Sequence, residues 1–86
     1  MRIDRTKNFK KQFKKLDQRI QDKFIERVKL FIADPTDPIL KNHPLKGNYA
    51  GYWSMNISGD IRALYLKQGE TIIIFALIGT HSSLYG

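Results

Sequence analysis

The sequence predicts a small α+β domain in which two N-terminal helices pack on a mainly antiparallel four-stranded sheet, in the element order β-α-α-β-β-β. Three observations lead to this fold class. Apolar residues recur at helical spacing in residues 7–34, three strand-like runs follow in residues 53–78, and 86 residues suffice for only one domain, residues 1–86. Because both helices carry an apolar stripe, we expect them to cover one face of the sheet and leave the other partly open.

The first part of the chain contains a short strand and two amphipathic helices. Residues 1–5 alternate apolar and polar side chains, as a strand does, and Thr6 can cap the helix that follows. Asp17 can cap a second helix, which Asp34 and Pro35 end because proline cannot continue a helix. The apolar stripes consist of Phe9, Phe13 and Leu16 in the first helix and of Ile20, Phe24, Val28, Phe31 and Ile32 in the second.

The second half of the chain has the pattern of a three-stranded meander. Three prolines make residues 34–47 a loop. Residues 53–58 and 61–66 form two strand-like runs on either side of a turn, and residues 71–78 are apolar on both faces, which predicts a central or covered strand. The short connections make these three strands antiparallel, and the N-terminal strand can add to one edge of the sheet.

The composition excludes several kinds of site. The chain has no cysteine, which rules out disulfides, thiolate metal sites and a cysteine nucleophile. Its two histidines and scattered carboxylates lack the spacing of a structural metal site, so we expect neither a metal nor a cofactor. No apolar stretch approaches the ~20 residues that cross a bilayer, and the charged N-terminus lacks the apolar segment of a signal peptide, so we expect a cytoplasmic protein without membrane contact.

The positive charge is concentrated in the first half of the chain. The formal net charge is +7, and residues 1–46 hold 13 of the 15 Lys and Arg but 6 of the 8 acidic residues, whereas residues 47–86 are balanced. Such a field attracts phosphate polymers, because contact releases their condensed counterions. A solvated, lysine-rich helix face without any partner explains the charge equally well.

The only two histidines, His43 and His81, lie in turn-like segments before and after the predicted meander. Histidine can both accept and donate a proton near neutral pH. Two histidines on loops beside a sheet therefore suggest acid/base chemistry.

Three segments, in their joint order and spacing, resemble the RelE/ParE superfamily of bacterial toxins and most closely its YafQ-like branch. They are His43-Pro44-Leu45-Lys46-Gly47 with Gly51-Tyr52, then Gly59-Asp60-Ile61-Arg62-Ala63-Leu64-Tyr65, and finally Gly79-Thr80-His81-Ser82-Ser83-Leu84-Tyr85-Gly86. The resemblance implies a RelE-like fold and the toxin of a type II toxin-antitoxin system. It further implies a ribosome-dependent mRNA endonuclease that is a monomer when free and forms a hetero-oligomer with a cognate antitoxin.

The resemblance also implies metal-free cleavage, in which a ribose 2′-hydroxyl attacks the adjacent phosphate. That reaction requires a base, a cation for the phosphorane charge and an acid for the departing oxygen. His81 matches the C-terminal histidine of YafQ-like toxins and His43 their loop histidine, so these two would share proton transfer. Arg62 would stabilise the phosphorane, and Asp60 would support the site. The ordinary alternatives are a polar cap for His81, a turn residue for His43, and a surface pair of Arg62 with an Asp60 that merely starts a strand.

Two further positions would contact the substrate. Tyr85 would stack on a base, although it can also close the edge of the core, and Lys46 would contact a phosphate, although it can also face solvent. Where the YafQ pattern has further functional groups, this chain has Ser54, Asn56, Ile61 and Leu77. Ser54, Asn56 and Leu77 favour a second hypothesis, a non-catalytic RelE/ParE-fold binding protein such as a ParE-like DNA gyrase inhibitor. His81 and Arg62 speak against it. A third is a plain basic RNA-binding module.

Overall fold

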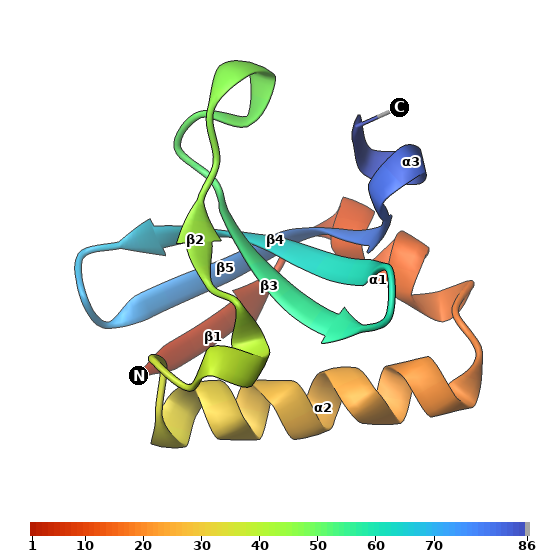
Figure 1. The fold of residues 1–86 in the computed structure, drawn as a ribbon, viewed down its shortest axis with the longest axis horizontal. Coiled ribbons are helices and arrows are strands. Elements are labelled where there is room, and N and C mark those ends of the chain that lie inside the picture. Colours follow the sequence, from red (N-terminus) through yellow and green to blue (C-terminus); the bar gives the residue numbers. More distant parts are fainter. Residues whose placement is uncertain (86) are drawn as a thin grey trace.

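A computed structural model describes residues 1–85 as a five-stranded mixed sheet with helices on one face (Figure 1). The sheet order is β1-β5-β4-β3-β2; β1 is parallel to β5, and all other neighbours are antiparallel. The elements are β1 (Arg2–Arg5), α1 (Lys7–Lys14), α2 (Gln18–Ala33), the 3-10 helix η1 (Pro38–Leu40), β2 (His43–Pro44), the 3-10 helix η2 (Gly47–Tyr49), β3 (Trp53–Ser58), β4 (Ile61–Gln68), β5 (Ile72–Thr80) and α3 (His81–Tyr85).

The predicted fold class is confirmed, with two differences in the element count. The sheet has five strands and not four, because His43 and Pro44 in the expected loop pair with Ser54 and Trp53 of β3. The expected turn-like segment after β5 forms the short helix α3. Strand β2 has two residues and α3 has five, so neither is long enough to produce a periodic pattern.

Both predicted helix caps are confirmed. The Thr6 hydroxyl accepts a hydrogen bond from the Phe9 N–H at 3.1 Å, and the Asp17 carboxylate accepts one from the Ile20 N–H at 3.0 Å. These oxygens satisfy backbone donors that have no partner within the first turn of a helix. The Thr6 hydroxyl also donates to the Ala76 carbonyl at 3.2 Å, which ties the start of α1 to β5.

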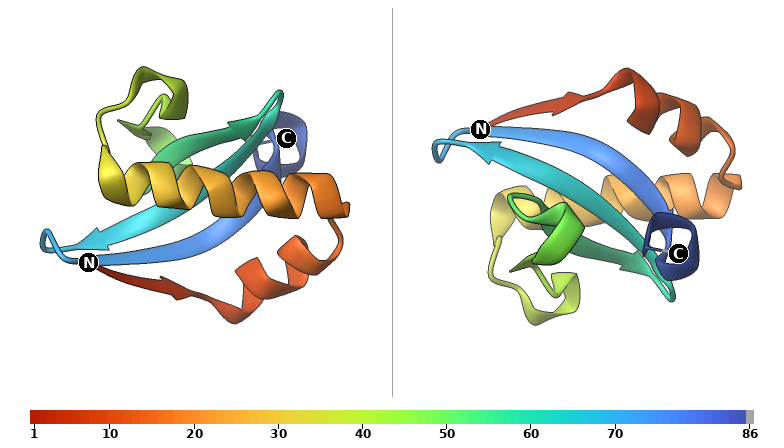
Figure 2. Two further views of the ribbon diagram at one scale, coloured as in Figure 1. Left: turned by 90° about the horizontal axis from the view of Figure 1, so that it is seen from below. Right: turned by 90° about the horizontal axis from the view of Figure 1, so that it is seen from above.

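The core lies between the two N-terminal helices and one face of the sheet, and Figure 2 shows α2 crossing that face. Phe9 of α1 and Phe24 of α2 meet Phe75 of β5, with ring centroids 5.1 to 5.8 Å apart. Tyr65 of β4 and Phe31 of α2 extend this aromatic cluster at 5.5 Å. The expected packing of the helices on one sheet face follows from this aromatic contact, and the polar strand positions are left on the other face.

The opposite face of the sheet is only partly covered. The segment around η2 and the helix α3 both project from that side, whereas α2 lies on the other side (Figure 1). The Tyr49 hydroxyl of η2 donates a hydrogen bond of 2.6 Å to the Leu84 carbonyl of α3. This bond joins the two projections beside the open face. Among residues 1–85, none of the helices combines the length and the apolar character needed to span a bilayer.

Candidate active site on the open face of the sheet

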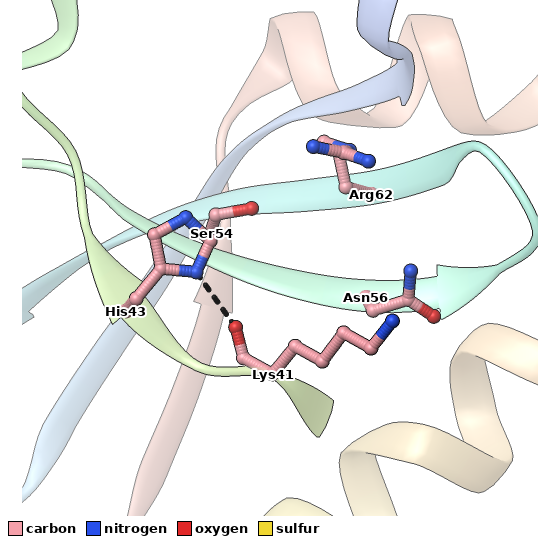
Figure 3. Close-up of a pocket in the computed structure, with 5 residues that line it drawn as sticks. All are labelled: Lys41, His43, Ser54, Asn56 and Arg62. Atoms are coloured by element: carbon pink, nitrogen blue, oxygen red, sulfur yellow. Dashed lines mark hydrogen bonds between the residues drawn. The ribbon is translucent and has the colours of Figure 1, made fainter. Parts of the chain in front are cut away.

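A small pocket opens on the uncovered face of the sheet (Figure 3). Strand pairing explains its position. His43 lies opposite Ser54, and Asn56 lies opposite Arg62, so each pair shares one face of the sheet. The pocket is lined by Lys41, His43, Ser54, Asn56 and Arg62.

His43 is held by a hydrogen bond within its own loop. Its Nδ1 lies 2.7 Å from the Lys41 carbonyl oxygen. A carbonyl oxygen only accepts hydrogen bonds, so Nδ1 carries the proton and, in the neutral ring, Nε2 has a free lone pair. The side chain is exposed, which leaves Nε2 accessible to a substrate proton.

Arg62 presents an incompletely paired guanidinium to this pocket. Its buried Nε has no hydrogen-bond partner among the described residues, and its Nη2 lies 3.8 Å from Oδ1 of Asp60. A buried donor without a partner is unfavourable in the free protein, and an anion that accepted a hydrogen bond from it would remove this penalty. The side chain is 25% exposed, so a ligand can reach its remaining donors. The arrangement therefore favours the binding of an anion.

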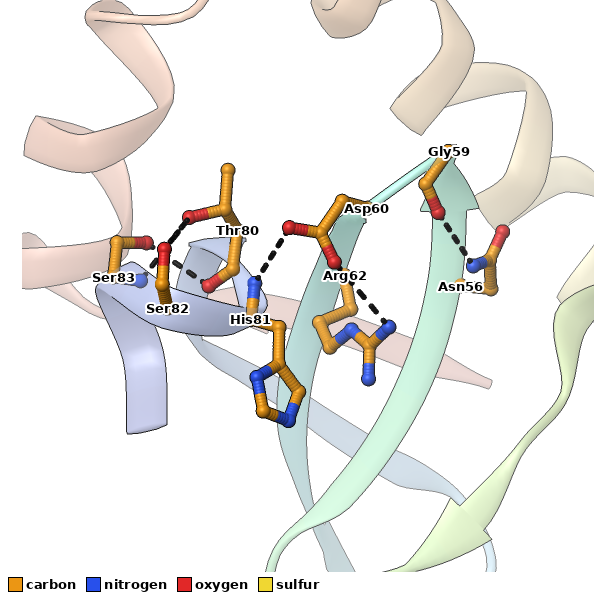
Figure 4. A network of polar contacts seen from close by, with 8 residues as sticks. All are labelled: Asn56, Gly59, Asp60, Arg62, Thr80, His81, Ser82 and Ser83. Carbon is orange, nitrogen blue, oxygen red and sulfur yellow. Dashed lines mark hydrogen bonds and ion pairs between the residues drawn. The ribbon is translucent and has the colours of Figure 1, made fainter. Parts of the chain in front are cut away.

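Asp60 connects Arg62 with the start of α3 (Figure 4). Its Oδ2 accepts a hydrogen bond of 3.3 Å from the backbone N–H of His81, while Oδ1 faces Arg62. The carboxylate thus binds the backbone N–H of His81 and not its ring. Asp60 follows Gly59, whose φ of +52° is a left-handed conformation typical of a glycine turn.

Local hydrogen bonds close α3 over the end of β5. The Ser83 N–H donates to the Thr80 hydroxyl at 3.1 Å, and the Ser83 hydroxyl donates to the Thr80 carbonyl at 3.0 Å. A side chain at Gly79 would obstruct this turn, because its Cβ would lie 2.5 Å from the Ser83 Oγ. The close approach of α3 to β5 therefore favours glycine at position 79, because any side chain there would force the Ser83 hydroxyl to rotate away from the Thr80 carbonyl.

Aromatic contacts position the exposed ring of His81. Its centroid lies 4.7 Å from the Tyr85 ring, one turn later in α3. Tyr85 in turn packs edge-on against Tyr49 of η2 at 5.4 Å. His81 therefore faces the open side of the molecule from a helix that η2 supports.

The structure brings most of the predicted site residues into one neighbourhood. His43 and Arg62 line the same pocket, and Asp60 joins Arg62 to the backbone of His81. Tyr85 lies beside the His81 ring. The sixth predicted residue, Lys46, is exposed at the N-terminal end of η2 and is not among the residues that line the pocket.

Three residues that line the pocket were not predicted as site residues, namely Lys41, Ser54 and Asn56. The alternating pattern of residues 53–58 could have indicated Ser54 and Asn56, because it places them together on the face opposite to Met55 and Ile57. No local pattern indicates Lys41. Within residues 1–85, no three His, Asp or Glu side chains form a group that could hold a metal ion.

A buried hydroxyl anchors the segment that precedes His43. Tyr65 is fully buried, and its hydroxyl donates to Oδ1 of Asn42 at 3.1 Å. The Asn42 amide donates to the Pro35 carbonyl at 2.9 Å. Burial raises the pKa of the Tyr65 hydroxyl well above its ordinary value, because the phenolate form is poorly solvated there.

Replacing Tyr65 with phenylalanine is expected to lower the free energy of unfolding at pH 7 by about 1 kcal/mol and to flatten its alkaline dependence. In the unfolded chain this tyrosine ionises near pH 10, whereas in the folded chain it stays neutral. Stability is therefore retained below about pH 10 and lost above it, by up to about 1.4 kcal/mol per pH unit. Urea unfolding between pH 7 and pH 11 measures both effects. A Tyr52→Phe variant is the control, and equal alkaline slopes in the wild type and Tyr65→Phe would contradict this account.

The β-α-α-β element order, with an arginine and a histidine on the open sheet face and an aspartate and a second histidine beside them, is that of a toxin domain of the RelE/ParE superfamily. The chain matches, over residues 1–86, the family described as the bacterial toxin YafQ of type II toxin-antitoxin systems. It therefore belongs to the YafQ toxin family.

Individual relatives agree with this assignment. The chain is 35% identical to toxin YoeB of Synechocystis sp. over 63 residues, which cover 69% of this chain and 73% of the relative. It is 33% identical to the mRNA interferase toxin YafQ of Escherichia coli K12 over 52 residues, which cover 60% of this chain and 55% of the relative. The crystal structure of YafQ from E. coli BL21(DE3) superposes over the full length of both chains with a TM-score of 0.83 and 25% identity. YafQ in the E. coli DinJ-YafQ complex has a TM-score of 0.78 and 26% identity, over 98% of this chain and 96% of that one.

Proposed function

We propose that this protein is a ribosome-dependent mRNA endonuclease that inhibits translation until an antitoxin neutralises it. The observation that carries the proposal is the Arg62 guanidinium beside His43 in an open pocket, with a buried donor that no group in the described part of the chain pairs. A site of this kind suits an RNA phosphodiester, whose phosphate brings an anion to Arg62 and whose neighbouring 2′-hydroxyl presents a proton to a histidine.

The reaction follows from the three groups around that phosphate. Nε2 of His43 accepts the proton of the ribose 2′-hydroxyl, and the oxygen attacks the adjacent phosphorus. Arg62 stabilises the negative charge of the phosphorane, held in place by Asp60. His81 gives a proton to the departing 5′-oxygen, so that a cyclic phosphate and a 5′-hydroxyl result. Tyr85, against the His81 ring, would stack on a neighbouring base.

The remaining parts of the proposal are the partners. The E. coli relative is named an mRNA interferase toxin and has been solved in complex with DinJ, which supports messenger RNA as the substrate and a small antitoxin as the partner. We expect a monomer when free and a hetero-oligomer with the antitoxin. The exposed lysines of α1 would contact ribosomal RNA. The protein would act in the cytoplasm. Lys46 would contribute a further phosphate contact from the start of η2.

The proposal is tested by adding the purified protein to a translation reaction and mapping the 5′ ends of the message. We expect cleavage at defined codons that requires translating ribosomes. A His81→Ala variant should cleave about a hundredfold more slowly, because the leaving oxygen then lacks its acid. Intact messages, or cleavage that is unaffected by His81→Ala, would refute the assignment.

A second candidate function is a non-catalytic toxin such as a gyrase inhibitor. Leu77 of β5 is half-buried on the open face, opposite the fully buried Leu64 of β4, so that face is not uniformly polar. Such a surface suits protein docking more than phosphate binding. Inhibition of DNA supercoiling by purified gyrase, with messages left intact in the translation reaction, would decide for this function.

A further inference from the structure

We propose that Lys41 is a substrate-binding residue of this site, where its ammonium group binds a second phosphate of the same RNA strand. This proposal rests on the proposed function and adds to it a contact that no pattern in the sequence indicates. It starts from the backbone of Lys41, which has φ +47° and ψ +39°. Lys41 is the only residue other than glycine with a positive φ within residues 1–85.

The neighbours of Lys41 impose this left-handed conformation. Leu40 is fully buried in the core, and Asn42 is held through both ends of its amide by Tyr65 and Pro35. The Lys41 N–H closes the end of η1 by donating to the Pro38 carbonyl at 3.2 Å. Glycine would adopt this backbone with less strain than lysine. The local backbone therefore gives no reason for a lysine at position 41. A role of the lysine side chain explains this residue better.

The left-handed turn directs two groups of Lys41 toward the site. Its carbonyl oxygen accepts from Nδ1 of His43, and its side chain extends along the pocket toward Asn56 (Figure 3). Arg62 lies on β4 and Lys41 lies just before β2, and β3 is the strand between β2 and β4. The two cations therefore reach the pocket from opposite sides of β3. Lys41 makes no ion pair with another residue in the described part of the chain. Its ammonium is thus available to a ligand.

The charges that line the pocket favour a ligand with more than one negative charge. Lys41 and Arg62 are its two permanent cations, and the nearby Asp60 carboxylate already faces Arg62. The forked guanidinium of Arg62 suits a phosphate that must be held in one orientation, as the reacting one must. The single ammonium of Lys41 suits a neighbouring phosphate, for which attraction matters more than orientation. A nucleic-acid strand supplies both phosphates at once.

The test measures the binding of a short RNA whose ribose at the cleavage position is 2′-deoxy, so that binding is separated from cleavage. We compare the wild type with Lys41→Gly, which suits the left-handed backbone and keeps the carbonyl that binds His43. We expect roughly tenfold weaker binding in low salt, and a slope of log affinity against log salt that is smaller by about 0.7, as for one lost contact to a single strand. Lys41→Arg should restore the slope. The thermal midpoint of Lys41→Gly should equal or exceed that of the wild type.

Lys29→Ala is the matched control, because it removes the same charge from an exposed position of α2. We expect its affinity and salt slope to stay close to those of the wild type. Equal affinities and slopes for the wild type and Lys41→Gly, or equal losses in Lys41→Gly and Lys29→Ala, would overturn the proposal. Normal phosphate binding through Lys41 without any cleavage of ribosome-bound messages would instead refute the nuclease alone.

Discussion

Replacing Arg62 with leucine is expected to slow transcript cleavage by about 10²- to 10³-fold without lowering the stability of the protein. The loss of rate follows because the phosphorane charge then has no guanidinium to stabilise it. Stability is expected to hold or to rise, because the substitution removes a buried Nε–H that has no hydrogen-bond partner within residues 1–85. The Asp60 contact that is lost is 3.8 Å long and exposed, so it contributes little. Mapping of 5′ ends measures the rate, and thermal unfolding measures the stability.

Arg27→Lys is the control for this prediction. Arg27 is also a half-buried arginine, and its Nε donates to the Ile57 carbonyl of β3 at 3.2 Å, away from the pocket. We expect Arg27→Lys to cleave at the wild-type rate even if its melting temperature falls slightly. Cleavage by Arg62→Leu at the wild-type rate would remove Arg62 from the mechanism. A large fall in its melting temperature would show that this arginine supports the fold instead.

Replacing Phe75 with alanine is expected to cost about 3 to 5 kcal/mol of unfolding free energy, the typical cost of a large cavity in a core. Phe75 is fully buried on β5, and its ring touches those of Phe9, Phe24 and Tyr65. The sheet and both N-terminal helices thus meet at one side chain. A domain of 86 residues has about 4 to 13 kcal/mol in total, so this loss is a large fraction of its stability and the variant is expected to unfold at a clearly lower temperature and urea concentration.

Phe75→Leu is the matched substitution, because it keeps an apolar side chain of intermediate volume at the same place. We expect it to remain folded and to lose about 1 to 2 kcal/mol. Circular dichroism during urea unfolding compares the three proteins. If Phe75→Ala lost no more stability than Phe75→Leu, the aromatic cluster would not be the principal core of the domain.

The elements with strong local patterns were predictable from the sequence. Phe9 and Phe24 lie on helical stripes that identify α1 and α2, and the caps Thr6 and Asp17 mark where those helices begin. Helix spacing, strand alternation and capping all act within a few residues along the chain, so a sequence can be read for them directly. The expected uncovered face of the sheet followed from the same patterns, because there were only two helices to cover it.

The short elements were not predictable, because distant partners create them. Strand β2 exists because His43 pairs with Ser54, a residue of β3 that follows an intervening 3-10 helix. Helix α3 depends on the close contact of Ser83 with Gly79 and is supported by the bond from Tyr49 to Leu84. None of these contacts leaves a periodic trace in the sequence.

The sequence by itself determined which chemical groups this toxin-family protein possesses, namely two histidines and an arginine next to an aspartate in recognisable segments. Only the tertiary structure decided how these groups are arranged into a site. Strand register places His43 and Arg62 in one pocket, and the Lys41 carbonyl selects the proton-bearing nitrogen of His43. Packing leaves Nε of Arg62 without a hydrogen-bond partner among the residues that the structure describes. The physical reason is that residue type is a local property, whereas register, left-handed backbone and burial arise from contacts between residues far apart in the chain.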